Sequence, residues 1–67
     1  MMNIGEKIKE KRSSMNLTQQ ELAAQLNVSR STVSNWEVGR NYPDIEMIVN
    51  ISNLLDVSLD VLLKGDD

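Results

Sequence analysis

The sequence contains no cysteine, no histidine and no phenylalanine among its 67 residues. The first two absences exclude disulfides, zinc sites of common spacing and nucleophiles activated by histidine. The length leaves room for one domain, spanning residues 1–67, which must be stabilised by close helix packing, by self-association, or by both. Because the lack of cysteine suits a reducing compartment, we expect a cytoplasmic protein.

Long apolar runs and glycine-rich loops are also missing. No apolar run exceeds three residues, as at Val61-Leu62-Leu63, whereas a membrane span needs about 20 residues and a signal peptide about 7–15. We therefore expect no membrane span and no export signal. The sequence also lacks a glycine-rich phosphate loop, and its acidic residues are too sparse for a metal site. Hence we expect no enzyme activity, metal, cofactor or small-molecule ligand.

The net charge of −3 is distributed unevenly along the chain. Residues 1–42 contain six basic and four acidic side chains, whereas residues 43–67 contain one basic and six acidic side chains. A polyanion can therefore approach the basic part of the molecule while the acidic part stays away from it.

Apolar spacing and capping residues predict an all-α fold of five helices. Thr18 and Glu21 match a capping box, and Ser29 is an N-cap for the next helix. Asn16 and Asn27 can end helices because asparagine tolerates the left-handed region. With only two aromatic residues, the core must consist of Leu, Ile, Val and Met, which favours helices. The predicted helices span about residues 3–15, 18–26, 29–38, 45–55 and 58–64.

The third predicted helix has one apolar and one polar face. Val33 and Trp36 point inward at i, i+3 spacing. The opposite face consists of hydrogen-bonding side chains without an acidic group, namely Arg30, Ser31, Ser34 and Asn35. A tight turn at residues 27–29 joins this helix to the preceding one, as in a helix-turn-helix motif. A polar rod of roughly 13 Å fits a DNA major groove about 12 Å wide.

The sequence closely resembles the phage repressor and Cro-like helix-turn-helix family, often called the XRE family. The residues that carry the resemblance are segments 17–23, 28–40 and 57–63, together with Pro43. The resemblance covers nearly the whole chain. It implies a compact, lambda-repressor-like domain of five helices that binds operator DNA, usually as a dimer. The chain departs from the family at Asn16 and Asn27, where glycine is common, but asparagine supports the same backbone.

The resemblance also implies roles for individual residues by matching position. The base-reading residues are Arg30, Ser31, Ser34 and Asn35. Arg30 can pair with guanine and Asn35 with adenine, and each such bidentate contact discriminates between bases by about 1–3 kcal/mol. Gln19, at a helix N-terminus, binds a DNA phosphate in this reading. The full phosphate-binding set is Gln19, Lys11, Thr32, Arg40, Asn41 and Tyr42.

Arg12 and Glu37 are assigned a structural role. Arg12 interrupts the inward apolar stripe of the first helix, and Glu37 lies at the end of the third helix. In the resemblance these two residues form an ion pair that holds the two helices together. Removing one partner of such a buried pair leaves an uncompensated charge.

A single reading helix contacts too few base pairs to select one site in a genome. We therefore expect a homodimer on palindromic double-stranded DNA, with its two reading helices about 34 Å apart. The fourth and fifth predicted helices and the loop before them contain apolar residues that are not all needed on the core-facing sides of these helices. We expect the dimer contact to consist of Tyr42, Pro43, Ile45 and Val61.

These observations predict a sequence-specific, double-stranded DNA-binding transcriptional regulator, acting as a repressor and associated with the nucleoid. The alternative is a protein-binding helical module of the same fold, such as an antitoxin or an accessory subunit. An acidic mimic of DNA fits less well because the third helix is polar without being acidic. The first two functions differ in one property, since only DNA binding weakens steeply with salt.

Overall fold

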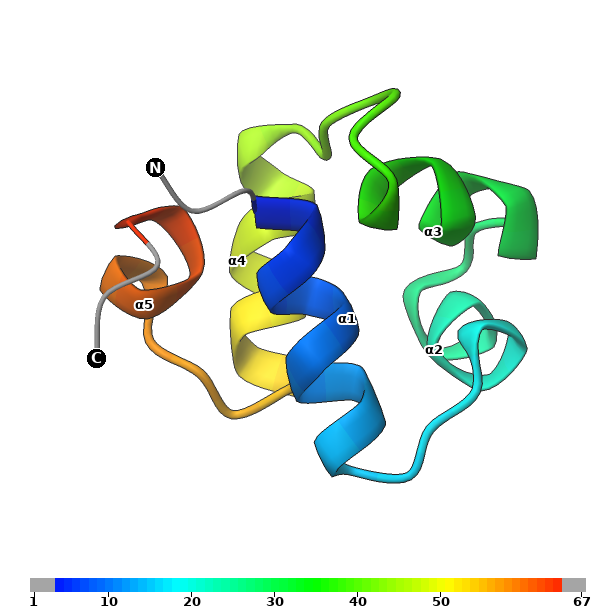
Figure 1. Ribbon diagram of the computed structural model, residues 1–67, viewed down its shortest axis with the longest axis horizontal. Helices are drawn as coiled ribbons and strands as arrows, with labels where there is room; N and C mark the ends of the chain where they lie inside the picture. The colour runs from blue at the N-terminus through cyan, green and yellow to red at the C-terminus, as the bar shows by residue number, and fades with distance from the viewer. Residues whose placement is uncertain (1–3, 65–67) are drawn as a thin grey trace.

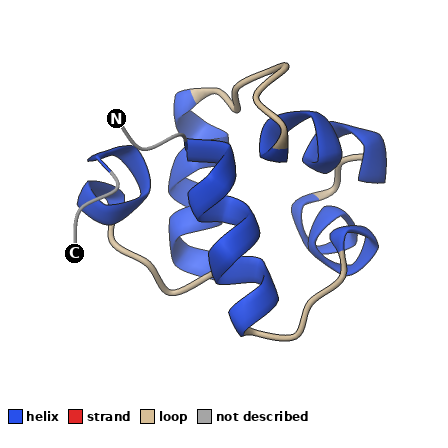
Figure 2. Ribbon diagram, viewed as in Figure 1, coloured by secondary structure: helices blue, strands red, loops and turns tan. Residues whose placement is uncertain are grey.

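The computed structural model describes residues 4–64 and contains five helices in this range. In chain order they are α1 (Ile4–Ser14), α2 (Gln19–Leu26), α3 (Arg30–Glu37), α4 (Ile45–Leu54) and α5 (Leu59–Lys64) (Figure 1). Short loops connect them, and no strand occurs within residues 4–64 (Figure 2). The predicted all-α fold of five helices is confirmed. Residue 3, where the first helix was predicted to begin, lies outside the described residues.

Most helices are slightly shorter than predicted because their capping residues are not helical. Thr18 and Ser29 have extended backbones, and their side chains accept hydrogen bonds from the backbone N–H groups of Glu21 and Thr32. The Glu21 carboxylate in turn accepts from the Thr18 N–H at 2.8 Å, which completes the capping box. Asp44 caps α4 in the same way through the Met47 N–H. These caps determine where each helix begins.

Left-handed residues end α1 and α2 where the sequence predicted. Asn16 has φ 59° and Asn27 has φ 60°. The Asn27 N–H donates to backbone carbonyls in the last turn of α2, which closes that helix directly before the turn into α3. Asp56, with φ 52°, takes the same conformation between α4 and α5. The predicted helix bounds left a turn at residues 56–57, but they did not indicate the left-handed conformation of Asp56.

The core lies where the five helices meet. Its members are buried apolar side chains from every helix and from the loop before α5: Ile4, Ile8, Leu22, Ala23, Val33, Trp36, Ile48, Ile51, Leu55, Val57 and Leu62. α1 packs against α3 and α5, and α2 packs against α3 and α4. Figure 1 shows α5 on one side of α1 and the α2–α3 pair on the other. No helix within residues 4–64 is both long enough and apolar enough to cross a bilayer.

Several apolar residues of α4 and α5 stay at the surface. Ile45 is 72% exposed and Val49 is 42% exposed, and these two residues, one turn apart, form an exposed apolar stripe on α4. On α5, Leu62 is fully buried, whereas Leu59 and Leu63 are exposed. The exposed stripe of α4 is available for contacts with another molecule.

Prediction for the turn between α2 and α3. Replacing Asn27 by alanine should lower the free energy of unfolding by about 1 kcal/mol. Alanine has a Cβ, which disfavours the left-handed backbone, but it lacks the polar side chain that lets asparagine tolerate this conformation. Replacement by glycine, which adopts φ 60° without strain, should leave stability unchanged or slightly higher. Chemical denaturation monitored by circular dichroism measures both variants. Equal stability of the two variants would contradict the role assigned to this residue.

Candidate nucleic-acid interface

α3 presents its polar face to solvent. Arg30 and Ser31 are exposed and Ser34 and Asn35 are half-buried, while Val33 on the opposite side is completely buried. The acidic residue of α3, Glu37, is also buried, with 6% of its surface exposed. Consequently no carboxylate from α3 lies on the outward strip. The four residues assigned to base reading share one accessible face, although their contact with DNA stays a prediction.

The N-terminus of α3 is organised by a cluster of hydroxyl groups. The Ser29 Oγ lies 3.0 Å from the Ser31 Oγ and 2.9 Å from the Thr32 Oγ1, and it also accepts from the Thr32 N–H at 3.1 Å. This arrangement places Ser31 and Thr32 beside the cap. Their hydroxyl groups can exchange the contact with Ser29 for one with an incoming acceptor, because a hydroxyl both donates and accepts.

The loop after α3 folds back onto the end of the helix. Gly39 has φ 83°, a conformation that side chains with a Cβ disfavour. The backbone N–H groups of Arg40 and Asn41 then donate to the Asn35 carbonyl at 2.9 and 3.4 Å. The Arg40 Nη1 lies 3.4 Å from the Asn35 Oδ1. The loop thus brings a cation directly beside the outward face of α3, and Asn41 and Tyr42 follow as exposed residues.

A buried ion pair connects α1 to the end of α3. The Arg12 Nε donates to the Glu37 Oε2 at 2.7 Å, and the Arg12 Nη2 donates to the Glu37 Oε1 at 3.1 Å. The Arg12 Nη1 also donates to the Leu17 carbonyl at 2.7 Å, which ties in the segment before α2. The side chains of Arg12 and Glu37 are only 12% and 2% exposed. The ion pair that the family resemblance implied for these two residues is therefore present.

The surroundings of Arg12 favour its charged form. The hydrogen bonding that Arg12 donates to the Glu37 carboxylate raises the pKa of Arg12 above its ordinary value, burial acts in the opposite direction, and the charge of Glu37 adds to the increase. Arginine therefore remains a cation in this site. The pair combines opposite charges with matched bidentate geometry, which is the arrangement that suits a guanidinium and a carboxylate.

Gln19 lies between this ion pair and the outward face of α3. Its Nε2 donates to the Glu37 Oε1 at 3.0 Å, and its Oε1 accepts from the Arg30 Nη1 at 3.2 Å. The sequence predicted a phosphate-binding role for Gln19 but gave no sign of these two contacts. They join residues 18 and 11 positions apart, so no local periodicity could have revealed them.

Two lysines of α1 differ in their surroundings. Lys11, assigned to phosphate binding, is half-buried in the last turn of α1. Among the described residues, its side chain forms no hydrogen bond with a residue of α3. Lys7 is only 3% exposed, and its Nζ donates to the Glu10 Oε1 at 3.1 Å. Sequence reasoning missed this buried lysine. Its spacing of three residues from the buried Ile4 was the available signal.

The proposed dimer residues do not all lie at the surface. Tyr42 is 68% exposed and Ile45 is 72% exposed, so both are available for a contact. Pro43, however, is buried within the protomer. It lies just before α4 and offers little accessible surface, so the protomer structure speaks against its assignment to the dimer contact. Val61 is only partly accessible because it packs against the core.

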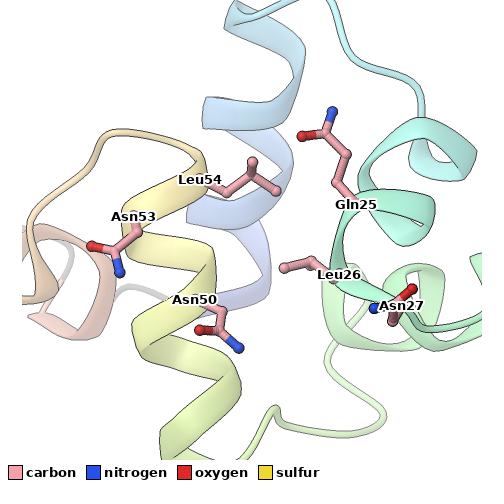
Figure 3. Close-up of a pocket in the computed structure, with 6 residues that line it drawn as sticks. All are labelled: Gln25, Leu26, Asn27, Asn50, Asn53 and Leu54. Carbon is pink, nitrogen blue, oxygen red and sulfur yellow. The ribbon is translucent and has the colours of Figure 1, made fainter.

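A separate groove of about 470 Å³ lies between the end of α2 and α4. Figure 3 shows the six residues that line it, four of which carry carboxamide groups: Gln25, Asn27, Asn50, Asn53, Leu26 and Leu54. No charged side chain lines the groove, so it offers no cation to a DNA phosphate. Within residues 4–64 there is also no group of three or more His, Cys, Asp or Glu side chains arranged to hold a metal ion.

A capped helix, a tight left-handed turn and a second helix with an outward polar face together define a helix-turn-helix domain. Residues 8–62 match the helix-turn-helix family, and the chain belongs to it. The resemblance inferred from the sequence to phage repressors and related regulators is confirmed.

Proteins similar to this chain include several regulators. The chain is 44% identical over 66 residues to the HTH-type transcriptional activator BcrR of Enterococcus faecalis, covering 98% of this chain and 32% of BcrR. It is 46% identical over 61 residues to the uncharacterised HTH-type regulator YqaE of Bacillus subtilis strain 168, covering 91% of this chain and 53% of YqaE. The chain thus spans about half, or less, of the length of these relatives.

The fold is shared with a solved repressor. A crystal structure of the P22 c2 repressor in complex with a synthetic operator superposes with a TM-score of 0.91 and 33% sequence identity, covering 98% of this chain and all of that chain. P22 is a Salmonella phage. The match extends from α1 to α5, so the prediction of a lambda-repressor-like architecture is also confirmed.

Prediction for the ion pair. Arg12→Met or Glu37→Leu alone should lower the free energy of unfolding by about 3–5 kcal/mol, because each leaves its partner charged and buried without compensation. The double variant should lose less than either single variant. A double-mutant cycle from thermal or chemical denaturation measures the coupling. Additive losses would show that the two side chains do not depend on each other for stability.

Proposed function

We propose that the protein is a sequence-specific, double-stranded DNA-binding transcriptional regulator, acting as a repressor. The observation that carries the proposal is the outward strip of α3, which offers donors and acceptors without a carboxylate. Arg30 stands at one end of the strip, and Arg40 lies beside the other end. The operator complex of the P22 c2 repressor supports the same mode of action, because its fold matches over the whole chain.

The dimensions of α3 suit the major groove. Eight residues give a length of roughly 12 Å, and a helix with its side chains is about 10–12 Å wide, close to the width of the groove. In this arrangement the Arg30 guanidinium donates to O6 and N7 of a guanine, and the Asn35 amide pairs with N6 and N7 of an adenine. Ser31 and Ser34 contact neighbouring base edges through their hydroxyl groups.

Phosphate contacts orient the domain on the duplex. Gln19 is the first residue of α2, where free N–H groups favour an anion, and its Nε2 has a second hydrogen besides the one directed at Glu37. The exposed segment of Arg40, Asn41 and Tyr42 contacts the backbone beyond the other end of α3. Thr32 and Lys11 are secondary candidates. Such contacts give affinity without reading sequence.

Selection of bound duplexes from a random pool tests the proposal. The expected result is an enriched motif with two inverted half-sites whose centres are about one helical turn apart. Absence of any enriched motif, combined with binding that is insensitive to salt, would overturn the proposal. That outcome would favour the alternative function, a protein-binding module such as an antitoxin or accessory subunit.

Prediction for phosphate binding. Arg40→Ala should weaken binding to matched and unmatched duplexes alike and should reduce the slope of log affinity against log salt by about 0.9 per protomer, or about 1.8 for a bound dimer. Lys64→Ala, at the end of α5, removes a charge of the same sign and serves as the control. Fluorescence anisotropy at several salt concentrations measures the slope. An unchanged slope in Arg40→Ala would remove this residue from the interface.

We also propose that the regulator binds as a homodimer through the start of α4 and the loop before it. Tyr42, Ile45 and Val49 expose apolar surface there, and the last two are one turn apart on α4. A two-fold axis in this region brings the same residues of both protomers together. Val61 contributes at most an edge, because it packs against the core.

Prediction for the dimer. Ile45→Glu should weaken binding to a palindromic duplex by on the order of tenfold or more, since two-fold symmetry places the two new carboxylates close together. Ile45 is mostly exposed in the protomer, so the fold should be unaffected. Met15→Glu, at another exposed apolar position, is the matched control. Sedimentation velocity should show two protomers per duplex for the control and one for Ile45→Glu, whereas a single protomer in the unsubstituted protein would contradict the dimer.

A further inference from the structure

Four side-chain carboxamides gather around the groove between the end of α2 and α4. Gln25 and Asn27 lie on its α2 side, and Asn50 and Asn53 lie on α4 (Figure 3). Within residues 4–64, none of these four side chains forms a hydrogen bond with another group of the protein. Each carboxamide carries two N–H donors and an oxygen acceptor. The groove therefore brings together free donors and acceptors from two separate helices.

The inner part of the groove is apolar. Leu26 and Leu54 are half-buried and pack against the core, while the rest of each side chain lines the groove. The volume of about 470 Å³ falls within the range of about 300–1,000 Å³ that is usual for binding sites with an apolar lining and a few polar groups. The groove thus suits an occupant that combines an apolar side chain with uncharged polar groups.

The charges in and around the groove restrict the chemistry of that occupant. The six lining residues are all uncharged. Glu21 lies one turn before Gln25 on α2, and Glu46 lies one turn before Asn50 on α4. Both carboxylates belong to exposed residues. An uncharged segment that is flanked by lysine or arginine therefore complements the groove and its surroundings, whereas an acidic segment would be repelled.

We propose that this groove binds an extended peptide segment of another protein, with an apolar side chain against Leu26 and Leu54 and a basic residue beside it. A peptide group has one N–H and one C=O, and a carboxamide can accept from the first and donate to the second. Such main-chain hydrogen bonds supply affinity in peptide recognition, and side-chain pockets supply specificity. The described part of this chain consists of helices with short connections, so a second copy offers no comparable extended segment.

The groove is separate from the proposed DNA interface. None of its six lining residues is among those proposed for base reading or phosphate binding. A peptide in the groove therefore leaves the outward strip of α3 uncovered, and the two surfaces together would connect a DNA site to a second protein. Because peptide binding can be measured without DNA, the inference does not depend on the proposed function.

Panning a phage-displayed library of random heptapeptides against the full chain tests the proposal. The enriched peptides should share an apolar residue within an uncharged stretch, next to lysine or arginine. Gln25→Ala and Asn50→Ala should each weaken binding of a selected peptide by about two- to tenfold, the factor expected for one hydrogen bond. Gln20→Ala removes the same group from α2 outside the groove and should leave the affinity unchanged. All three positions are exposed in helices, where alanine is well tolerated.

Replacement of single main-chain N–H groups in a selected peptide by ester oxygens tests recognition of the peptide backbone. At least one such replacement should weaken binding by a similar two- to tenfold factor. The same replacement should cost little in the variant that lacks the matching carboxamide, because the hydrogen bond is already lost. Fluorescence anisotropy measures each affinity. Ester peptides that all bind as tightly as the parent peptide would contradict main-chain recognition.

The same variants separate a foreign peptide from the other occupants. Enrichment of no peptide, of acidic peptides, or of peptides that bind Gln25→Ala and Asn50→Ala as tightly as Gln20→Ala would overturn the proposal. Asn53 lies one turn after Val49 of the proposed dimer contact, so sedimentation velocity of the free variants is also required. If Gln25→Ala and Asn50→Ala weaken self-association instead of peptide binding, a second copy occupies the groove and the proposal is wrong.

Discussion

The contact on which the arrangement depends is the buried pair of Arg12 and Glu37. These residues lie 25 positions apart, and their bidentate contact joins the last turn of α1 to the last residue of α3. The same guanidinium contacts the carbonyl of Leu17, so the segment entering α2 is held by the same group. Arg12 therefore fixes the positions of both helices of the helix-turn-helix relative to α1. The interaction also keeps the carboxylate of Glu37 away from the outward face of α3.

Capping residues refine the arrangement that this pair establishes. Thr18 and Ser29 begin α2 and α3, while Asn27 in the left-handed conformation allows a short turn between them. Gly39 then reverses the chain so that Arg40 reaches Asn35. Each of these local features acts within a few residues, yet together they determine which side of α3 faces outward. Base reading, phosphate contact and dimer contact are thus proposed for neighbouring parts of one surface.

Features with local causes were predictable from the sequence, and features that depend on distant contacts were not. The capping box at Thr18 and the left-handed asparagines act over one or two turns, as does the inward spacing of Val33 and Trp36, so the helices and the outward face of α3 followed from them. The simultaneous contacts of Gln19 with Glu37 and Arg30 and the burial of Pro43 depend on tertiary packing. The Arg12–Glu37 contact was expected only through the family resemblance, since no local rule pairs residues so far apart.

The central claim is that the Arg12–Glu37 pair holds α3 with its polar face outward for insertion into the major groove. Titration of the ¹⁵N-labelled protein with its selected duplex tests it most directly, by following backbone amide shifts along the chain. The largest changes should fall on residues 29–35 and 39–42 and on the start of α2, with little change in the amides of α5. Changes concentrated in the groove between α2 and α4, with α3 unaffected, would contradict the account.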